Sequence, residues 1–225
     1  MAKDMTLFWG SGSPPCWRVM ITLEEKNLSD YKSNLLSFEK NEQKSKAVLD
    51  LNPRGQLPTF KHGALVICES YAACLYLEAK FKEQGTKLIP TCPNEQALMY
   101  QRLFEVVPLG DKLSNVIYYE WKVPEGERFE SAKNRNKEAV GVELSLWEGY
   151  LKKTEPYLTG KNFSMADVVA FPGIAYAFQM GLCPHRFPYL AKYYNLLKER
   201  PSIKKTWPAV WKEKKDLFKD IQNSS

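Results

Sequence analysis

Hydrophobic positions in the first third of the chain alternate between the two-residue spacing of β-strands and the three-to-four-residue spacing of α-helices. We expect strands at residues 5–9, 31–36, 58–61 and 65–68, and helices at residues 13–28, 43–51 and 71–81. His62-Gly63 lies between the last two strands and predicts a tight hairpin turn there. The predicted order of elements is therefore β-α-β-α-β-β-α.

Beyond residue 94 the spacing of hydrophobic positions is helical throughout. Helices are expected at residues 95–121, 127–151, 168–180, 188–200 and 207–221. Ser164, with Asp167 three positions later, is a variant of the capping box and predicts the start of the third of these helices. Residues 85–94 contain one glycine and two prolines without periodicity, which indicates a linker. We therefore expect an α/β domain at residues 1–84 and an all-helical domain at residues 95–225.

Composition and charge exclude several classes of protein. Of the 225 residues, 44% are hydrophobic and 26% are charged, which is ordinary for a globular protein and excludes a disordered chain. No apolar run approaches the roughly 18–20 residues that span a bilayer, and residues 1–6 do not resemble a signal peptide, so we expect a cytoplasmic protein. The net charge of +6 comes from alternating bases and acids, and the lysine cluster at residues 204–215 fits a solvated helix face. Neither nucleic acid nor membrane is therefore an expected partner.

The cysteines and histidines exclude further chemistry. Five cysteines, an odd number without CxxC spacing, indicate reduced thiols rather than a disulfide framework. The two histidines, His62 and His185, form no cluster with the cysteines at zinc-ligand spacing. We expect no metal site and no catalytic triad built on histidine.

The first candidate for chemistry is Ser13-Pro14-Pro15-Cys16, between the first expected strand and the first expected helix. Serine is a good N-cap, and proline is tolerated in the first turn of a helix. Thioredoxin-like redox proteins place CxxC here, but Ser13 cannot attack a disulfide. Its hydroxyl can donate a hydrogen bond to the thiolate of a ligand, near the positive end of the helix dipole. A cap and a thiolate donor are both possible, because a hydroxyl accepts and donates at once. Cys16 is expected to pack inward.

Two further motifs point to a peptide-like ligand. Pro58 follows Leu57 directly before an expected strand, so Leu57 is restricted to extended conformations. If the bond between them is cis, Leu57 presents both its N–H and its C=O to a peptide; the alternative is a plain loop. Glu69-Ser70 places an acid at a helix N-terminus, which suits a ligand with an amine and a carboxylate, although Ser70 also fits an ordinary N-cap.

Taken together, these motifs resemble the cytosolic glutathione S-transferases, and the detail around residues 10–19 and 37–42 is most similar to the rho class. The matching patterns are Ser13-x-x-Cys16-x-Arg18-Val19, Asn52-Pro53-x-Gly55-x-Leu57-Pro58, Glu69-Ser70 and Tyr157-Leu158-x-Gly160-x-x-Phe163-Ser164-x-Ala166-Asp167. The resemblance runs from about residue 5 to 220. It implies a thioredoxin-like glutathione-binding domain followed by an all-helical domain, normally in a homodimer. Glutathione would be the co-substrate, without a further cofactor.

The resemblance also implies roles for individual residues. Ser13 would activate the thiol, with Ser11 as the second candidate. The glutathione site would comprise Gln43, Lys44, Gln56, Leu57, Pro58, Glu69 and Ser70. Within it, Leu57 would bind the cysteinyl main chain, and the Glu69-Ser70 pair would bind the γ-glutamyl end. Gln43 or, alternatively, Lys44 would bind the glycyl carboxylate.

The electrophile pocket is expected to be lined by aromatic and apolar residues from both domains. The candidates are Trp9, Phe104, Val107, Tyr118, Tyr119, Trp207 and Trp211. Aromatic residues at helical spacing also fit a plain hydrophobic core. The expected function is conjugation of glutathione to hydrophobic electrophiles, as in detoxification of xenobiotics. The alternatives are a glutathione-dependent peroxidase or isomerase on the same fold, and a non-catalytic scaffold.

Overall fold

The structure is a computed structural model that describes residues 2–223. The chain divides into two compact units, which are Met1–Ile89 with Arg200–Lys212, and Pro90–Glu199 with Glu213–Ser225. The domain limits expected at residues 84 and 95 stay a prediction. Residues 200–212, however, group with the first unit and not with the helical one.

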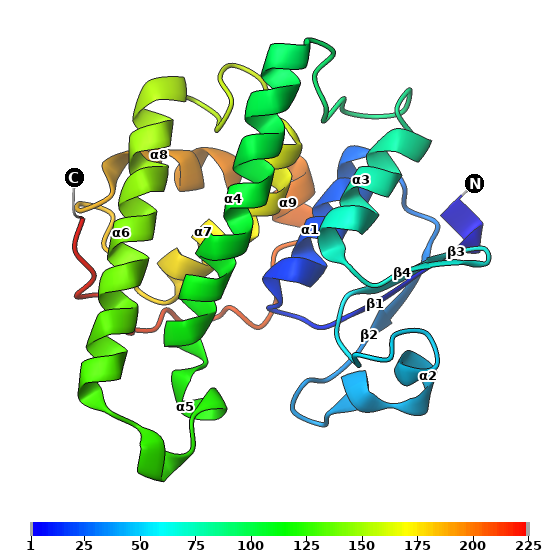
Figure 1. Ribbon diagram of the computed structural model, residues 1–225. Helices are drawn as coiled ribbons and strands as arrows, with labels where there is room; N and C mark the ends of the chain where they lie inside the picture. Colours follow the sequence, from blue (N-terminus) through cyan, green and yellow to red (C-terminus); the bar gives the residue numbers. More distant parts are fainter. Residues whose placement is uncertain (1, 224–225) are drawn as a thin grey trace. The chain divides into compact units, whose positions relative to one another are not determined.

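The first unit is built on a four-stranded mixed sheet (Figure 1). Its elements are η1 (Ala2–Asp4), β1 (Met5–Trp9), α1 (Pro14–Glu25), β2 (Lys32–Leu35), η2 (Glu42–Lys44), α2 (Lys46–Leu49), β3 (Thr59–His62), β4 (Leu65–Ile67), α3 (Ser70–Lys80) and α9 (Pro201–Lys205). The strand order is β2-β1-β3-β4, with β1 parallel to β2 and the other pairs antiparallel. The predicted β-α-β-α-β-β-α order and thioredoxin-like class are confirmed.

One turn differs by a residue from its prediction. His62 pairs with Leu65 at the end of the β3–β4 ladder, so the two turn residues are Gly63 and Ala64. Gly63 has a φ of 58°, which a residue without a side chain adopts readily.

The core of the first unit lies between the sheet and helices α1 and α3. Met5 and Leu7 alternate with partly exposed residues along β1, and both are fully buried. Val19 and Leu23 on α1, and Leu77 on α3, are also fully buried. Helix α1 packs against α3, which fixes the position of α1. The N-terminus of α1 follows the end of β1. The loop from Gly10 to Ser13 is therefore held at both of its ends.

The second unit is helical. Its elements are α4 (Pro93–Ile117), α5 (Tyr119–Lys122), η3 (Glu125–Glu127), α6 (Glu130–Thr154), α7 (Met165–Gln179) and α8 (Pro188–Leu197). Helix α7 is buried along nearly its whole length and packs against α4 and α8. The predicted capping box is confirmed, because Ser164 and Asp167 bond each other's main-chain N–H groups at the start of α7.

Two helix predictions fail near the end of the chain. The helix expected to reach residue 200 ends at Leu197, because Pro201 favours the extended conformation found at Arg200 (φ −63°, ψ 131°). The helix expected at residues 207–221 is wrong, since this segment is irregular. Its residues instead form hydrogen bonds to other elements, such as Phe218 N–H to Met180 O at 2.8 Å. Tyr118 also interrupts the long helix expected at residues 95–121.

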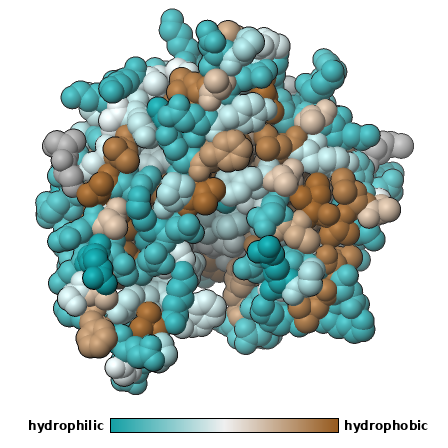
Figure 2. Space-filling model, viewed as in Figure 1, coloured by the Kyte–Doolittle hydropathy of each residue, from teal (hydrophilic) through white to brown (hydrophobic). Residues whose placement is uncertain are grey.

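The surface shows both hydrophobic and hydrophilic residues, as the composition of the chain predicts. On the face in Figure 2, hydrophobic side chains are interspersed among a larger number of hydrophilic ones. Across residues 2–223, every helix is too short or too polar to span a membrane.

Candidate functional site

Ser13 is the N-cap of α1, as predicted. Its φ of −84° and ψ of 114° are extended, and its Oγ accepts a hydrogen bond from the N–H of Cys16 at 3.4 Å. Pro14 and Pro15 have no N–H, and the N–H of Trp17 donates to the Ser13 carbonyl at 3.0 Å. The N–H groups of Cys16 and Trp17 are therefore engaged with Ser13. The Ser13 hydroxyl also lies against the buried Cys16 thiol, and its O–H is the donor of this loop that a ligand thiolate could use.

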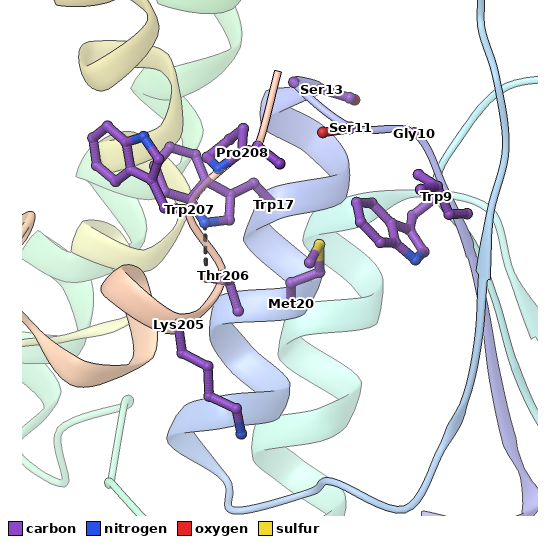
Figure 3. A pocket seen from close by; sticks show the side chains of 13 residues that line it. Trp9, Gly10, Ser11, Ser13, Trp17, Met20, Lys205, Thr206, Trp207 and Pro208 are labelled. Carbon is purple, nitrogen blue, oxygen red and sulfur yellow. Dashed lines mark hydrogen bonds between the residues drawn. The ribbon is translucent and has the colours of Figure 1, made fainter. Parts of the chain in front are cut away.

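A cavity of about 180 Å³ opens beside Ser13. Its lining comes from the end of β1, the β1–α1 loop, one face of α1, β2, the end of α9 and the segment that follows α9. The lining residues are Trp9, Gly10, Ser11, Gly12, Ser13, Trp17, Met20, Leu35, Lys205, Thr206, Trp207, Pro208 and Ala209. In Figure 3, Ser11 and Ser13 lie at one end of the view and Lys205 at the other. The structure thus brings together four residues of the expected site, which are both serines, Trp9 and Trp207.

Trp17 and Trp207 form part of one wall of this cavity, and Trp211 packs against both of them. Trp17 Nε1 donates to Thr206 Oγ1 at 2.8 Å, and its ring meets those of Trp207 and Trp211 edge to face, each at 5.2 Å between centroids. Both C-terminal tryptophans thus pack on α1 within the first unit. Trp211 is not among the residues that line the cavity. Gly12 has a φ of 81°, which favours glycine, and a Cβ there would lie 2.9 Å from Val210 Cγ2 and 3.2 Å from Trp211 Nε1.

The segment before β3 presents the main chain of Leu57. The Leu57–Pro58 bond is cis. The Leu57 side chain packs against Cys16 and Val48, while its N–H and C=O form no hydrogen bond within residues 2–223. Asn52 holds this loop, donating from Nδ2 to Gln56 O at 2.9 Å. The motif Asn52-Pro53-x-Gly55-x-Leu57-Pro58 contains Asn52, but the sequence alone does not show that its side chain holds the loop.

At the start of α3, Glu69 is exposed and Ser70 is buried. Glu69 is the N-cap residue, without a side-chain cap, and Ser70 is the first helical residue. The interpretation of Ser70 as an ordinary N-cap is therefore wrong. Its Oγ accepts a hydrogen bond from Arg18 Nη1 at 3.2 Å. Arg18 was part of a matched motif, but the sequence did not show where its side chain points.

The polar residues expected at the glycyl carboxylate lie on and beside η2. Gln43 Nε2 donates to Asn41 Oδ1 at 3.2 Å, and its Oε1 is buried without a hydrogen-bond partner. Lys44 Nζ donates to the carbonyl of Arg54 at 2.9 Å, across the loop that leads to Pro58. Gln56 is exposed on the same loop. Contact of these residues with a carboxylate stays a prediction.

Cys16 packs inward, as expected. Its side chain is 1% exposed, and burial raises the pKa of its thiol to about 11, although hydrogen bonds with Ser13 and the N–H of Gly10 act in the opposite direction. The thiol is therefore protonated at neutral pH and has little nucleophilic character.

The remaining electrophile-pocket candidates lie on α4 and α5 of the second unit. Phe104 and Val107 are 64% and 46% exposed on α4, and Tyr118 is partly exposed at its end. Tyr119 is buried, and its hydroxyl accepts a hydrogen bond from the N–H of Phe129 at 3.1 Å. Tyr119 therefore holds its own loop, whereas the other three present apolar surface. Their contact with a substrate stays a prediction.

Within residues 2–223, no group of three or more histidine, cysteine, aspartate or glutamate side chains is arranged to hold a metal ion.

Comparison with known proteins agrees with this arrangement. Family models for the N-terminal and C-terminal domains of glutathione S-transferases match residues 12–80 and 110–206. Glutathione S-transferase A of Pleuronectes platessa is 63% identical, over 98% of this chain and 100% of the relative. Glutathione S-transferase 1 of Dianthus caryophyllus is 33% identical, over 76% of each chain.

Solved structures give the same result. A glutathione S-transferase from the Antarctic clam Laternula elliptica is 38% identical, with a TM-score of 0.87 over 97% of this chain and 99% of that one. A glutathione transferase of Phanerochaete chrysosporium in complex with oxidized glutathione is 30% identical, with a TM-score of 0.80 over 91% and 95%. Sequence, fold and motifs agree, and this chain belongs to the glutathione S-transferase family.

Proposed function

We propose that this enzyme conjugates the thiolate of glutathione to hydrophobic electrophiles, with Ser13 as the group that activates the thiol. The observation that carries the proposal is the Ser13 hydroxyl, which caps α1 with its oxygen and has a proton that it can donate to a bound thiolate. It lines a cavity together with the apolar rings of Trp9 and Trp207. A thiolate at this position is next to the space that an apolar electrophile would fill.

Three segments of the first unit would hold glutathione. The unpaired main chain of Leu57, before cis Pro58, suits the cysteinyl amide. Glu69 and Ser70 suit the amine and carboxylate of the γ-glutamyl end. Gln43, or alternatively Lys44, would bind the glycyl carboxylate beside Gln56. The Phanerochaete relative, which was solved in complex with oxidized glutathione, supports a glutathione site on this fold.

The energy needed to ionise the thiol is within reach of one hydroxyl and one helix end. A thiol with a pKa near 8.5 is about 3% ionised at pH 7, and lowering that pKa by two units takes about 2.7 kcal/mol. A hydrogen bond to a charged group contributes roughly 1.5–3 kcal/mol, and a helix N-terminus roughly 0.3–2 kcal/mol. Neither a histidine nor a metal is required.

The other functions weighed for this fold are less well supported. A dithiol reductase needs an accessible low-pKa cysteine, whereas Cys16 is buried and has a raised pKa. A non-catalytic scaffold would use Ser13 as a helix cap but has no need of the unpaired Leu57 main chain. We also propose a cytoplasmic homodimer that acts on xenobiotics, as the family resemblance implies.

One assay separates conjugation from its alternatives. The purified protein is incubated with glutathione and a panel of haloarenes, hydroxyalkenals and organic peroxides, beside the Ser13→Ala variant. Conjugation predicts thioether products from the haloarenes or alkenals, formed much more slowly by the variant. Turnover of peroxides alone would favour the peroxidase, and no turnover of any compound would favour the scaffold.

A further inference from the structure

Arg18 belongs to α1, and its buried, positively charged side chain reaches the N-terminus of α3. The residue is 6% exposed, and its Nη1 donates to Ser70 Oγ at 3.2 Å. The guanidinium carbon lies 4.4 Å from the centroid of the Tyr71 ring, a cation–π geometry. The same guanidinium is close enough to the thiols of Cys16 and Cys74 to lower their pKa values in part. Arg18 is therefore held against the first turn of α3.

The hydrogen bond with Arg18 determines the role that the Ser70 hydroxyl can take. Arginine has donors and no acceptor, so Ser70 Oγ must accept, and the proton of the hydroxyl points elsewhere. A hydroxyl keeps its proton when it accepts, so Ser70 can accept from Arg18 and donate to an anion at the same time. The bond from Arg18 fixes the position of the Ser70 oxygen and therefore limits the directions in which the O–H can donate.

The positive charges near Ser70 also favour the binding of an anion there. Helix α3 is 11 residues long, and its N-terminus carries the positive end of the helix dipole. The buried guanidinium adds a full positive charge beside that end, in surroundings where water screens it weakly. Guanidinium stays protonated even when buried. An anion that accepts from Ser70 would interact with both charges.

We propose that Arg18 is a positioning residue for the γ-glutamyl α-carboxylate of glutathione and acts through the hydroxyl of Ser70. This inference rests on the proposed function. Arg18 does not touch the tripeptide; it orients the donor that does and adds its charge behind it. The binding step forms hydrogen bonds and transfers no proton.

The test compares two ligands that differ in this carboxylate alone. One is glutathione, and the other is γ-aminobutyryl-Cys-Gly, in which a hydrogen replaces the α-carboxylate. Calorimetry measures both affinities for the wild type and for Arg18→Gln. The wild type should prefer glutathione, and the variant should lose about tenfold of that preference, the size of one charge-assisted hydrogen bond. The affinity for γ-aminobutyryl-Cys-Gly should stay the same.

Arg102→Gln is the matched control. Arg102 is likewise buried, bonds to Glu105 at 2.6 Å and lies 3.5 Å from the centroid of the Tyr150 ring, but it belongs to the second unit. Its loss should lower thermal stability without changing the preference between the two ligands. In a Ser70→Ala background, Arg18→Gln should cause a smaller further loss of preference than in the wild type, because only the charge of Arg18 is then lost and not its hold on the donor.

A measurement on the wild type does not depend on the variant folding. In isotopically labelled protein, the side-chain N–H resonance of Arg18, assigned by through-bond correlation to its own main chain, should shift with glutathione and much less with γ-aminobutyryl-Cys-Gly. Equal shifts, or equal losses of affinity for both ligands in Arg18→Gln, would overturn the role of Arg18 while leaving the proposed function intact. A wild type that binds neither ligand would overturn the proposed function itself, and this inference with it.

Discussion

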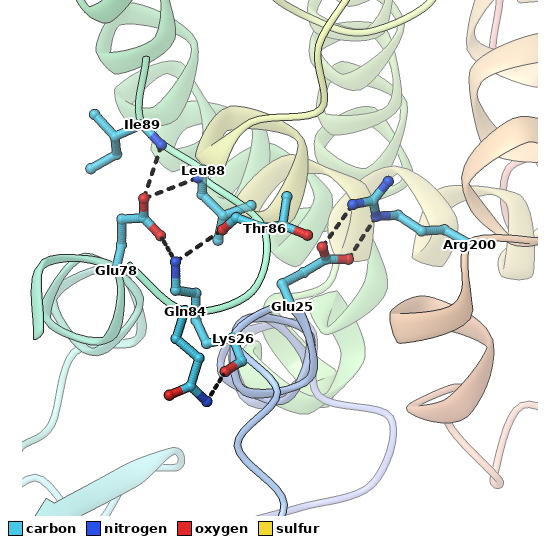
Figure 4. Close-up of polar contacts among 8 residues, drawn as sticks. All are labelled: Glu25, Lys26, Glu78, Gln84, Thr86, Leu88, Ile89 and Arg200. Carbon is cyan, nitrogen blue, oxygen red and sulfur yellow. Dashed lines mark hydrogen bonds and ion pairs between the residues drawn. The ribbon is translucent and has the colours of Figure 1, made fainter. Parts of the chain in front are cut away.

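Lys26 and Glu78 form an ion pair that joins the end of α1 to α3. Lys26 Nζ lies 2.7 Å from Glu78 Oε2, and the two side chains are 0% and 5% exposed. Lys26 also donates to the carbonyl of Thr86, while Glu78 Oε1 accepts from the N–H groups of Leu88 and Ile89 (Figure 4). One buried pair therefore fixes two helices and the segment that follows α3.

Removing one charge of this pair should destabilise the protein strongly. Glu78→Gln leaves the Lys26 ammonium buried without its counter-charge, so we expect the free energy of unfolding to fall by about 3–5 kcal/mol. Urea denaturation measures the change. Asp50→Asn is the control, because Lys46 and Asp50 form an exposed pair, worth about 1 kcal/mol or less. Equal losses in the two variants would contradict the prediction.

The neighbouring residue Glu25 makes a second connection, on the other side of α1. Arg200 donates two hydrogen bonds to its carboxylate, from Nε at 2.6 Å and from Nη2 at 2.7 Å (Figure 4). Burial acts to raise the pKa of Glu25, but the hydrogen bonds from Arg200 and Ser202 outweigh it and lower the pKa overall. This contact attaches residues 200–212, and with them Trp207, to the first unit.

The sequence predicts contacts between residues that are close in the chain, but not contacts between residues that are far apart in it. The Ser13 cap and the Ser164–Asp167 box were predicted because each involves residues three positions apart. Glu25 and Arg200 are 175 positions apart, so no local pattern pairs them. The hydrophobic positions of residues 207–221 predict a helix, but hydrogen bonds to distant parts of the chain override that preference. The contact between Arg18 and Ser70 joins residues 52 positions apart, so no local pattern predicts it either.

Cys16 should be chemically inert in the folded protein. With a pKa raised to about 11 by burial, its thiolate fraction at pH 8 is on the order of 0.1%. We expect iodoacetamide to modify exposed Cys92 first and Cys16 only after unfolding, as peptide mass spectrometry would show. Cys16→Ala should keep most of the conjugating activity. A variant that still binds glutathione but has lost its activity would make Cys16, and not Ser13, the important group.

Asp167 should make the stability of the second unit depend on pH. Burial raises its pKa to about 6, against hydrogen bonds from Leu158, Ser164 and Tyr193 that lower it. The folded state therefore holds a proton at pH values where the unfolded state, with a pKa near 3.9, has released it. The contribution of Asp167 is complete below about pH 4 and is lost as the pH rises through about 6, with a total of roughly 3 kcal/mol.

The measurement is the free energy of unfolding of wild type and Asp167→Asn between pH 4 and 7. The wild type should lose stability relative to the variant as the pH rises across this range, because the amide does not titrate. Asp30→Asn, in an exposed loop, is the control for the change in charge. Parallel curves for wild type and Asp167→Asn would mean that the hydrogen bonds fully offset the burial.

Ser13→Ala should raise the pKa of the bound glutathione thiol and leave the affinity for glutathione much less affected. Its hydroxyl acts on the ionised sulfur, while Leu57, Glu69 and Ser70 hold the tripeptide elsewhere. Losing a hydrogen bond of roughly 1.5–3 kcal/mol corresponds to about one to two pKa units. Activity at neutral pH should fall about tenfold or more and recover in part at alkaline pH. The ultraviolet absorbance of the thiolate, titrated with glutathione bound, measures the shift directly.

Two controls separate activation of the thiol from capping of the helix. The Ser13 cap bond to Cys16 is long, at 3.4 Å, so its loss should lower the free energy of unfolding by about 1 kcal/mol or less, which urea denaturation can check. Ser11→Ala changes a second hydroxyl that lines the same cavity but does not cap α1. We expect its thiol titration to match that of the wild type. If instead Ser13→Ala titrates with the wild type and Ser11→Ala is shifted, then Ser13 is a helix cap alone, and Ser11 is the hydroxyl that donates to the thiolate.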